Sequence, residues 1–134
     1  MVELAADATI EEIREFFALD RFATNALCRI QEASRGHAVC TMQLTDDHRN
    51  AMGNVMGGAV FTLADFALAV ACNVGEKPTV SIESDIKFLT LAKGDVLTAT
   101  AVADRSGRHI GVYTITVTDE ENNIVAIMTA TTYR

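Results

Sequence analysis

The sequence of 134 residues contains no tryptophan, and aromatic residues make up only 6% of it. Proline occurs once, at Pro78, and no proline-rich linker, internal repeat or low-complexity tract divides the chain. Residues 1–134 are therefore expected to form a single domain, and this length is enough for a real hydrophobic core.

Basic residues are scarce: 11 lysines and arginines face 18 acidic residues, which gives a formal net charge of −7. This balance argues against a general nucleic-acid-binding protein, which needs a basic face, but it leaves room for a local basic patch that binds a phosphorylated ligand.

The CxxC spacing is also missing. The three cysteines, Cys28, Cys40 and Cys72, lie in apolar contexts and are expected to be buried, reduced thiols.

The N-terminal segment lacks the basic start and apolar core of an export signal, so a cytoplasmic protein is expected. Hydrophobic residues nevertheless make up 49% of the chain. Two explanations are apolar surface buried between subunits and a membrane-spanning helix. The 18 residues from Gly57 to Val74 approach the length that spans a bilayer, but Asp65 near their centre makes insertion costly. We therefore expect an oligomer and no membrane segment.

Asp65 is the only charged residue between Ala51 and Gly75. A carboxylate on so apolar a helix is expected to be partly or wholly buried, which is unfavourable unless the charge is paired, solvated or used. Gly57 and Gly58 precede it, and a glycine-rich turn into a helix leaves backbone N–H groups free for an anion or a polarised carbonyl. Free amides beside an acid suggest an active site, although the acid could only cap a loop and the glycines could only allow a tight turn.

Hydrophobic periodicity predicts an α+β protein with one long helix and one antiparallel sheet. The apolar residues of segment 80–89 alternate with polar ones, which predicts a strand with one apolar face made of Val80, Ile82, Ile86 and Phe88. The expected elements are a helix over 9–19, strands over 22–33 and 37–45, a helix over 58–74, a strand over 80–89, and three closing strands joined by tight turns as an antiparallel meander.

The order of elements resembles the hotdog fold, in which a curved antiparallel sheet wraps a central helix. The resemblance is closest to the PaaI-like acyl-CoA thioesterases and covers nearly the whole chain. It rests on the segments HRNAMGNVMGGAVFTLADFALAVACN, TVSIESDIKFLTLAKGD and DRSGRHIGVYTITVTDEENNIVA. In that family an Asn and a Gly precede a His-Gly-Gly motif. Asp65 stands seven residues past Gly58, as the catalytic acid of the family does past its second glycine.

The resemblance implies roles for the residues at matching positions. Asn50 would position the thioester or the attacking water, and the backbone N–H of Gly57 would bind the thioester carbonyl. Asp65 would act as general base or nucleophile, and Ser81 would help to hold the water. Asn and Ser at such places also occur for turn or solvent-facing reasons alone. The expected reaction is hydrolysis of an acyl-CoA thioester to free acid and coenzyme A, without a metal or redox cofactor.

Substrate-binding roles follow for four further positions. Met56 stands where many members of the family carry a His that positions the substrate, and Gly58 completes the glycine pair. The loss of that His could change substrate preference, slow the reaction, or mark a protein that binds acyl-CoA without hydrolysing it. Arg105 and Arg108 lie at one turn with His109, where they could meet the phosphates of coenzyme A or form a solvated hairpin tip.

Other chemistries fit the sequence less well. No histidine pair has metal-ligand spacing on one element, and there is no GxSxG motif and no Cys with an evident His partner. A hotdog dehydratase needs an acid–His pair near the helix, and this helix has no His. A purely structural module would leave Asp65 unexplained.

The resemblance further implies sites shared between two subunits and a homodimer that assembles into a homotetramer. No nucleic-acid or membrane partner is expected, and the acyl group stays open.

Overall fold

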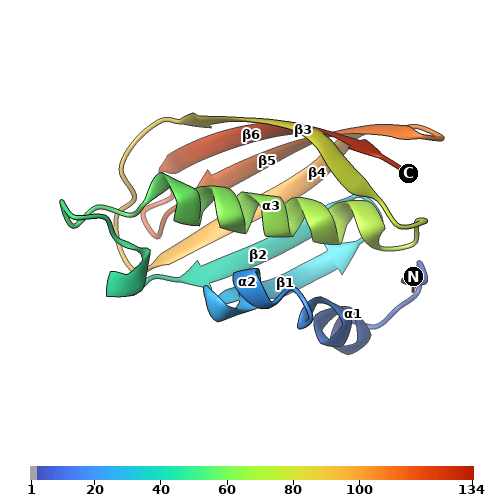
Figure 1. Ribbon diagram of the computed structural model, residues 1–134, viewed down its shortest axis with the longest axis horizontal. Helices are drawn as coiled ribbons and strands as arrows, with labels where there is room; N and C mark the ends of the chain where they lie inside the picture. Colours follow the sequence, from blue (N-terminus) through green and yellow to red (C-terminus); the bar gives the residue numbers. More distant parts are fainter. Residues whose placement is uncertain (1–2) are drawn as a thin grey trace.

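One long helix, α3, lies across one face of a six-stranded antiparallel sheet (Figure 1). The computed structural model describes residues 3–134. The strand order is β1-β2-β4-β5-β6-β3, so β1 and β3 are the two edges. The elements in chain order are α1 (Ile10–Phe17), α2 (Arg21–Asn25), β1 (Cys28–Ser34), β2 (His37–Gln43), the 3-10 helix η1 (Asp46–His48), α3 (Gly57–Asn73), β3 (Val80–Phe88), β4 (Val96–Ser106), β5 (Ile110–Thr118) and β6 (Ile124–Tyr133). The α+β class expected from the sequence is confirmed.

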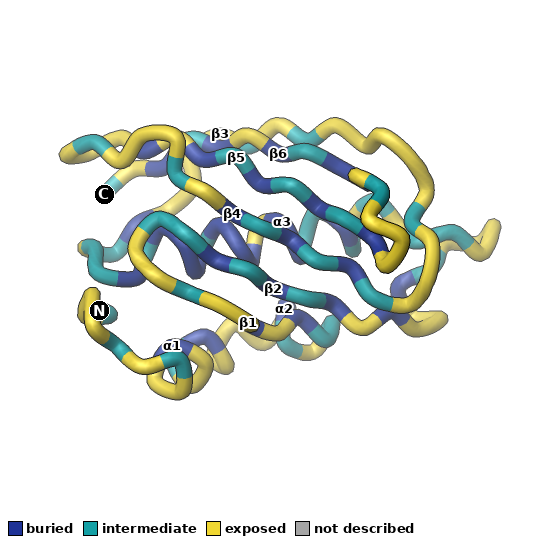
Figure 2. Tube along the Cα trace, turned by 180° about the vertical axis from the view of Figure 1, so that it is seen from behind, coloured by how far each residue is buried: buried dark blue, intermediate teal, exposed yellow. Residues whose placement is uncertain are grey.

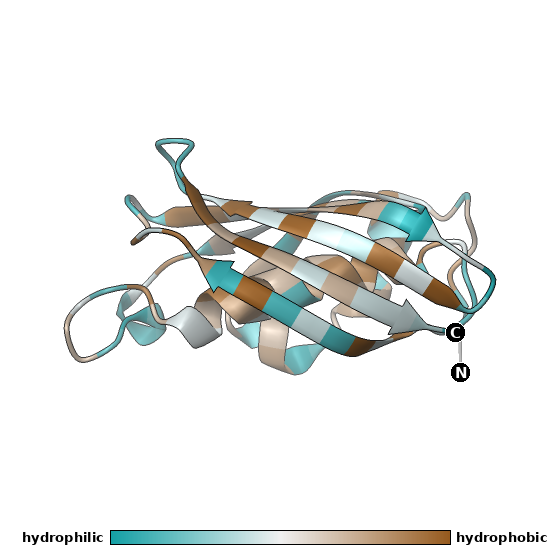
Figure 3. Ribbon diagram, turned by 90° about the horizontal axis from the view of Figure 1, so that it is seen from above, coloured by the Kyte–Doolittle hydropathy of each residue, from teal (hydrophilic) through white to brown (hydrophobic). Residues whose placement is uncertain are grey.

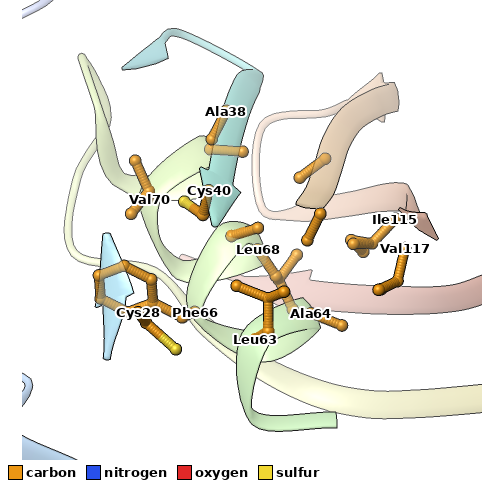
Figure 4. Packing of buried hydrophobic residues seen from close by; sticks show 14 of the residues in the cluster. Cys28, Ala38, Cys40, Leu63, Ala64, Phe66, Leu68, Val70, Ile115 and Val117 are labelled. Carbon is orange, nitrogen blue, oxygen red and sulfur yellow. The ribbon is translucent and has the colours of Figure 1, made fainter. Parts of the chain in front are cut away.

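The bounds of α3 are close to the expected 58–74. Its many alanines and leucines favour the helical state. The helix ends where Val74 turns to extended backbone and Gly75 takes a positive φ of 72°, a conformation that glycine adopts without strain. Pro78 then prevents the helix from resuming. The side of α3 that packs on the sheet carries Leu63, Ala64, Phe66, Leu68 and Val70 (Figure 4).

Strands β4, β5 and β6 form the expected antiparallel meander, which is confirmed. Hydrophobic and more polar residues alternate along these strands (Figure 3), and so do buried and partly exposed ones (Figure 2). Ala101 pairs with Ile115, which in turn pairs with Met128, and all three are fully buried. Paired residues share one face of a sheet, so these side chains form a continuous apolar floor under α3.

The strand expected over 22–33 is wrong in its first half. Residues Arg21–Asn25 form the short helix α2, and β1 begins only at Cys28. The Thr24 hydroxyl donates a hydrogen bond to the Asp20 carbonyl oxygen at 3.0 Å. Leu27 has a positive φ of 69°, which breaks the helix before the strand starts. An Asp at the N-cap position, here Asp20, is a helix-start signal that alternation alone overlooks.

The simple alternation expected along β3 is also wrong, because the strand contains a β-bulge between Ser81 and Glu83. Phe88 and Ile86 pair with buried residues of β6 and face α3 as expected. The bulge inserts Ile82 as an extra residue, so Ser81 rather than Ile82 pairs with the buried Thr132. Ser81 therefore lies on the helix-facing side of the sheet, whereas Ile82 is 58% exposed.

The three cysteines are buried and free, as expected. Burial raises the pKa of each thiol to about 12, because an apolar environment disfavours the thiolate. Within residues 3–134, no helix is both long enough and apolar enough to cross a membrane.

Candidate active site

The loop that leads into α3 is held by His48, a buried side chain. The backbone N–H of Thr45 lies 2.9 Å from the Nδ1 of His48, so this nitrogen accepts a hydrogen bond. The proton of the neutral ring is therefore on Nε2, which donates to the Ala26 carbonyl oxygen at 2.7 Å. The His48 carbonyl oxygen accepts from the Met56 N–H at 2.8 Å. One histidine thus connects the end of α2 to the residue that precedes α3.

Asn50 lies in this loop, and its side chain has a turn role. Its Oδ1 accepts from the N–H of Met52 at 3.0 Å and of Asn54 at 3.1 Å. An Asn side chain that bonds nearby backbone in this way stabilises the turn. Its Nδ2 group donates no hydrogen bond within the described residues and is solvent-accessible, because Asn50 is exposed. The turn reading is confirmed, and a substrate-binding role for the Nδ2 donor stays a prediction.

Gly57 and Gly58 open α3, and Met56 before them gives the helix no side-chain cap. The first intrahelical bonds are donated by Ala59 and Val60, so the amides of the two glycines have no acceptor among residues 3–134. These amides form the positive end of the helix dipole. A Cβ atom built on Gly57 would lie 3.3 Å from the Phe88 ring, so a side chain here would press on β3.

Asp65 is exposed in the single chain but partly desolvated, so the prediction of partial burial is confirmed and that of whole burial is wrong. Its neighbours Ala64 and Phe66 face the sheet, and this turns Asp65 toward the opposite side of α3. It lines a pocket of about 390 Å³ between α2 and α3, together with Phe61 and Ala69. The walls of this pocket remove part of its water, and this desolvation raises the pKa of its carboxyl group.

Asp20 lines the same pocket and was not foreseen. It stands at the N-cap of α2, where an Asp usually accepts from the first helical amides, but its side chain makes no such bond. Burial first, and then the negative charge of Asp65, raise the pKa of Asp20. No ion pair within residues 3–134 includes either carboxylate. Two unpaired acids thus share one pocket, which only the packing of α2 on α3 reveals.

The expected catalytic residues do not all converge within one chain. Gly57 and Asp65 are eight residues apart on α3, which is about 12 Å along a helix axis at ~1.5 Å per residue. An oxyanion donor must lie about 3 Å from its oxygen. The Gly57 amide and the Asp65 carboxylate of one chain therefore cannot both touch one carbonyl group. Met56 is 53% exposed and lies over Gly58, next to the free amides.

The two expected coenzyme-binding arginines both lie near the tip of the β4–β5 hairpin, but only one of them lines the pocket there. Arg108 lines a pocket of about 410 Å³ with Lys77, His109 and Arg134, at the tip of the β4–β5 hairpin, and Arg105 does not line it. The Arg134 guanidinium is already used, because it bonds Ser106 at 3.1 Å and forms an ion pair with Glu76 at 3.7 Å. The cations available to a ligand there are Lys77, Arg108 and, when protonated, His109.

Comparison with known proteins places this geometry in a family. Residues 52–126, more than half of the chain, match the family model described as the thioesterase superfamily. The chain belongs to this superfamily. The acyl-coenzyme A thioesterase PaaI of Escherichia coli is 37% identical over 100 residues, which cover 74% of this chain and 71% of that protein.

Solved structures agree with the assignment to the thioesterase superfamily. The E. coli PaaI protein from the phenylacetic acid degradation operon superposes with a TM-score of 0.82 and 30% identity, covering 94% of this chain and 96% of that one. A hypothetical thioesterase of Streptococcus pneumoniae, solved with coenzyme A, gives 0.80 at 27% identity, covering 87% and 94%. The hotdog fold, the PaaI-like resemblance and the class of thioester hydrolase are therefore confirmed.

Proposed function

We propose that this protein hydrolyses an acyl-CoA thioester to a free acid and coenzyme A. The observation that carries the proposal is the pairing, on one helix, of two unbonded N-terminal amides with an unpaired carboxylate of raised pKa. The named relatives support it, since one is an acyl-coenzyme A thioesterase and another was solved with coenzyme A. A thioester carbonyl is already a good electrophile, so this modest apparatus is sufficient.

The Gly57 amide is the proposed oxyanion donor. As the thioester carbon becomes tetrahedral, negative charge develops on its oxygen, and an N–H at the positive end of a helix stabilises that charge. The absence of a Cβ at Gly57 lets the Phe88 ring pack closely against the start of α3, beside the proposed donor. Met56 and Gly58 form the neighbouring wall of the proposed substrate site.

Asp65 is the proposed base or nucleophile. As a base it takes a proton from water, the hydroxide adds to the carbonyl carbon, and the carbon–sulfur bond breaks to release the coenzyme A thiolate. As a nucleophile its carboxylate adds directly, the same bond breaks, and water then hydrolyses the resulting anhydride. The raised pKa of Asp65 supports both routes, since a carboxylate with a higher pKa is a stronger base and a better nucleophile.

Asn50 and Ser81 are proposed to hold the thioester or the attacking water. Asn50 offers the free Nδ2 donor, and Ser81 offers a hydroxyl on the helix-facing side of β3. The β-bulge supports this role for Ser81, because strict alternation would turn its hydroxyl away from α3.

Two subunits are proposed to complete each site. The ~12 Å between Gly57 and Asp65 is bridged if two α3 helices lie antiparallel, so that Gly57 of one chain approaches Asp65 of the other. The surface around β3 supports this arrangement, because it exposes large apolar residues on an edge strand and the segment after it: Val80, Ile82, Phe88, Leu89 and Leu91. We propose a homodimer that assembles into a homotetramer. Light scattering at micromolar concentration should give no stable mass near 14.4 kDa.

The nucleotide end of coenzyme A is proposed to bind near the β4–β5 hairpin. Arg108, Lys77 and His109 supply positive charge in an otherwise acidic protein, and Arg105 lies on the adjoining strand. Phosphate groups bind arginine strongly through paired N–H donors.

The deciding experiment is incubation with aryl-, short- and medium-chain acyl-CoAs, with a thiol reagent to detect released coenzyme A. Hydrolysis of at least one substrate that Asp65→Asn abolishes supports the proposal. The second candidate is a non-hydrolytic acyl-CoA-binding protein. Met56 favours it, because Met56 stands where the resemblance to the PaaI-like family puts a His, and a thioether barely accepts a hydrogen bond. Tight binding of acyl-CoA without release of thiol from any substrate would establish that alternative.

A further inference from the structure

Two exposed cations, Lys77 and Arg108, line the pocket at the tip of the β4–β5 hairpin, which we call the hairpin pocket. They come from separate turns: Lys77 follows α3 and precedes β3, whereas Arg108 lies between β4 and β5. Within residues 3–134 neither side chain takes part in an ion pair. Like charges that line one pocket repel each other, so other contacts must keep these two turns together.

Arg134 joins the two turns, and its side chain is only 5% exposed. Each of its three guanidinium nitrogens donates a hydrogen bond to a different residue. Nη1 donates to the Gly107 carbonyl oxygen, and Nη2 donates to the Ser106 hydroxyl at 3.1 Å. Nε donates to the Thr79 hydroxyl at 3.4 Å. The C-terminal end of β6 thus lies between the β4–β5 hairpin and the loop that follows α3 (Figure 1).

The residues that Arg134 bonds are neighbours of the two cations. On the hairpin side its guanidinium bonds the residue before Arg108, and its backbone N–H donates to the carbonyl oxygen of His109 at 2.9 Å. On the other side Thr79, which accepts from Arg134, donates its hydroxyl proton to the Lys77 carbonyl oxygen at 2.7 Å. Arg134 therefore fixes the backbone that carries each cation, while both cationic side chains stay exposed.

The acidic side chain of the hairpin pocket does not cancel this charge. Of the described residues that line the pocket, only Glu76 is acidic. Its Oε1 lies 3.6 Å from the Nε of Arg35, and its Oε2 lies 3.7 Å from the Nε of Arg134. Each carboxylate oxygen thus faces an arginine, which leaves Lys77 and Arg108 available to an anion. A chain of net charge −7 therefore carries a local positive site here.

We propose that Arg134 is a positioning residue that holds Lys77 and Arg108 side by side, so that together they bind the phosphate groups of one ligand. The inference rests on the proposed function, in which this ligand is the nucleotide end of coenzyme A. That end carries several phosphate groups, so cations from separate turns can each meet one. Each nitrogen of the Arg134 guanidinium already has a partner, and Arg134 acts through the two cations. Cations that are held in place before the ligand arrives bind it at a lower entropic cost.

Calorimetric titration of the whole chain with coenzyme A tests the proposal. Lys77→Gln and Arg108→Gln should each weaken binding ~10-fold, the ratio that about 1.4 kcal/mol gives. Arg134→Lys keeps the positive charge but has one nitrogen in place of three, so it cannot hold both turns and should weaken binding by a similar factor. The matched control is Arg29→Gln, because Arg29 is an exposed arginine of β1 that does not line the hairpin pocket.

Double variants separate positioning from a general loss of stability. In the Arg108→Gln background, Arg134→Lys should weaken binding by a smaller factor than in the parent, because one of the groups that it positions is gone. Thr79→Val is a milder variant, since it breaks only the connection to Lys77. It should weaken binding in the parent and have no effect in the Lys77→Gln background. Circular dichroism checks the fold of each variant.

Steady-state kinetics give a second readout. The cations meet coenzyme A at the end opposite the thioester, so Arg134→Lys should raise KM and leave kcat unchanged, whereas a loosened fold lowers kcat. The proposal is overturned if Arg134→Lys binds coenzyme A like the parent, if its effect is as large in the Arg108→Gln background, or if the parent does not bind coenzyme A. The expected pattern of affinities in a protein that hydrolyses no acyl-CoA would support the inference and contradict the proposed hydrolysis alone.

Discussion

The Nε2 of His48 lies 2.7 Å from the carbonyl oxygen of Ala26, so the buried imidazole donates to the residue that ends α2. The same residue accepts from Thr45 through its ring and from Met56 through its backbone. The loop that carries Asn50 is therefore fixed to the helix that carries Asp20. His48 positions the proposed site without touching the substrate.

Replacing His48 should weaken both stability and turnover. His48→Ala removes two part-buried hydrogen bonds, one to the Ala26 carbonyl oxygen and one from the Thr45 N–H, each worth roughly 0.5–1.5 kcal/mol. We expect a lower midpoint in urea, and a kcat that falls more than stability alone explains at temperatures where the variant is folded. The control is His37→Ala, because the His37 ring makes no hydrogen bond within the described residues. Equal effects of the two variants would contradict the positioning role.

Asp65→Asn should preserve the fold and the oligomer while kcat falls at least ~10²-fold, the scale of losing a general base. The carboxamide is nearly isosteric but cannot take a proton from water. Asp7→Asn is the matched control, an exposed acid outside the Asp65 pocket. Near-parental turnover by Asp65→Asn on any substrate that the parent hydrolyses would contradict the role of Asp65 as base or nucleophile.

Asp20→Asn should shift the pH profile. The negative charge of Asp65 raises the pKa of Asp20. Because repulsion between two carboxylates is mutual, replacing Asp20 by a neutral amide should lower the pKa of Asp65 toward the value that desolvation alone sets. The acid limb of kcat/KM should therefore move to lower pH. Arg21 lines the same pocket and Cys72 lies near Asp65, and both stay unchanged in this variant.

The thermal stability of Asp20→Asn provides a second, independent test of the raised pKa of Asp20. An acid whose pKa is higher in the folded protein than in the unfolded chain stabilises the fold at low pH, and this contribution is lost as the pH rises through the folded value. At pH 7 the variant should thus melt at or above the temperature of the parent. A lower melting temperature with an unchanged acid limb would mean that Asp20 only supports α2.

Gly57→Val should reduce kcat by roughly 10²–10³-fold, the effect of losing one oxyanion donor. Its side chain would meet the Phe88 ring and crowd the space that the thioester needs. The combined variant Gly57→Val with Phe88→Leu separates these effects, because it restores room on the β3 side alone. Recovery of activity in the combined variant would show that the glycine only allows close packing.

Met56→His should raise kcat on at least one acyl-CoA. An imidazole donates and accepts hydrogen bonds, and a substrate misplaced by about 1 Å can lose ~10²-fold in rate. Met56 is half exposed beside the free amides, so a polar ring of similar size fits without disturbing the core. Steady-state hydrolysis across the acyl-CoA panel is the measurement. If the variant loses activity on every substrate, the Met56 side chain itself is required for activity, and the prediction is wrong.

The predictable parts of the fold are those with a long, repeated signal. Helix α3 and the β4–β5–β6 meander could be predicted because many residues of each share one period. Helix α2 has only five residues, too few to establish a helical period beside the strand that follows. The bulge at Ile82 depends on how β3 pairs with β6, which sequence alternation alone does not contain.

Some residues of the candidate site could also be predicted from the sequence, and others could not. Asp65 could be singled out because its isolation is visible in the sequence, but its exposure could not, because α3 is apolar on nearly all sides and the alternation does not tell which side meets the sheet. Asp20 was missed because its importance comes from the packing of α2 on α3. His48 was missed because its partner Ala26 lies 22 residues away.

The β-bulge of β3 also has a consequence for changes in chain length. Ile82 is an extra residue that has no pairing partner on β6. Deleting it would therefore leave Ser81 opposite Thr132 and the rest of β3 in register. Straightening the strand with Ile82 retained would instead turn Ser81 outward and Val80 inward. A single-residue deletion, usually the most disruptive change a strand can suffer, is at this one point the conservative one.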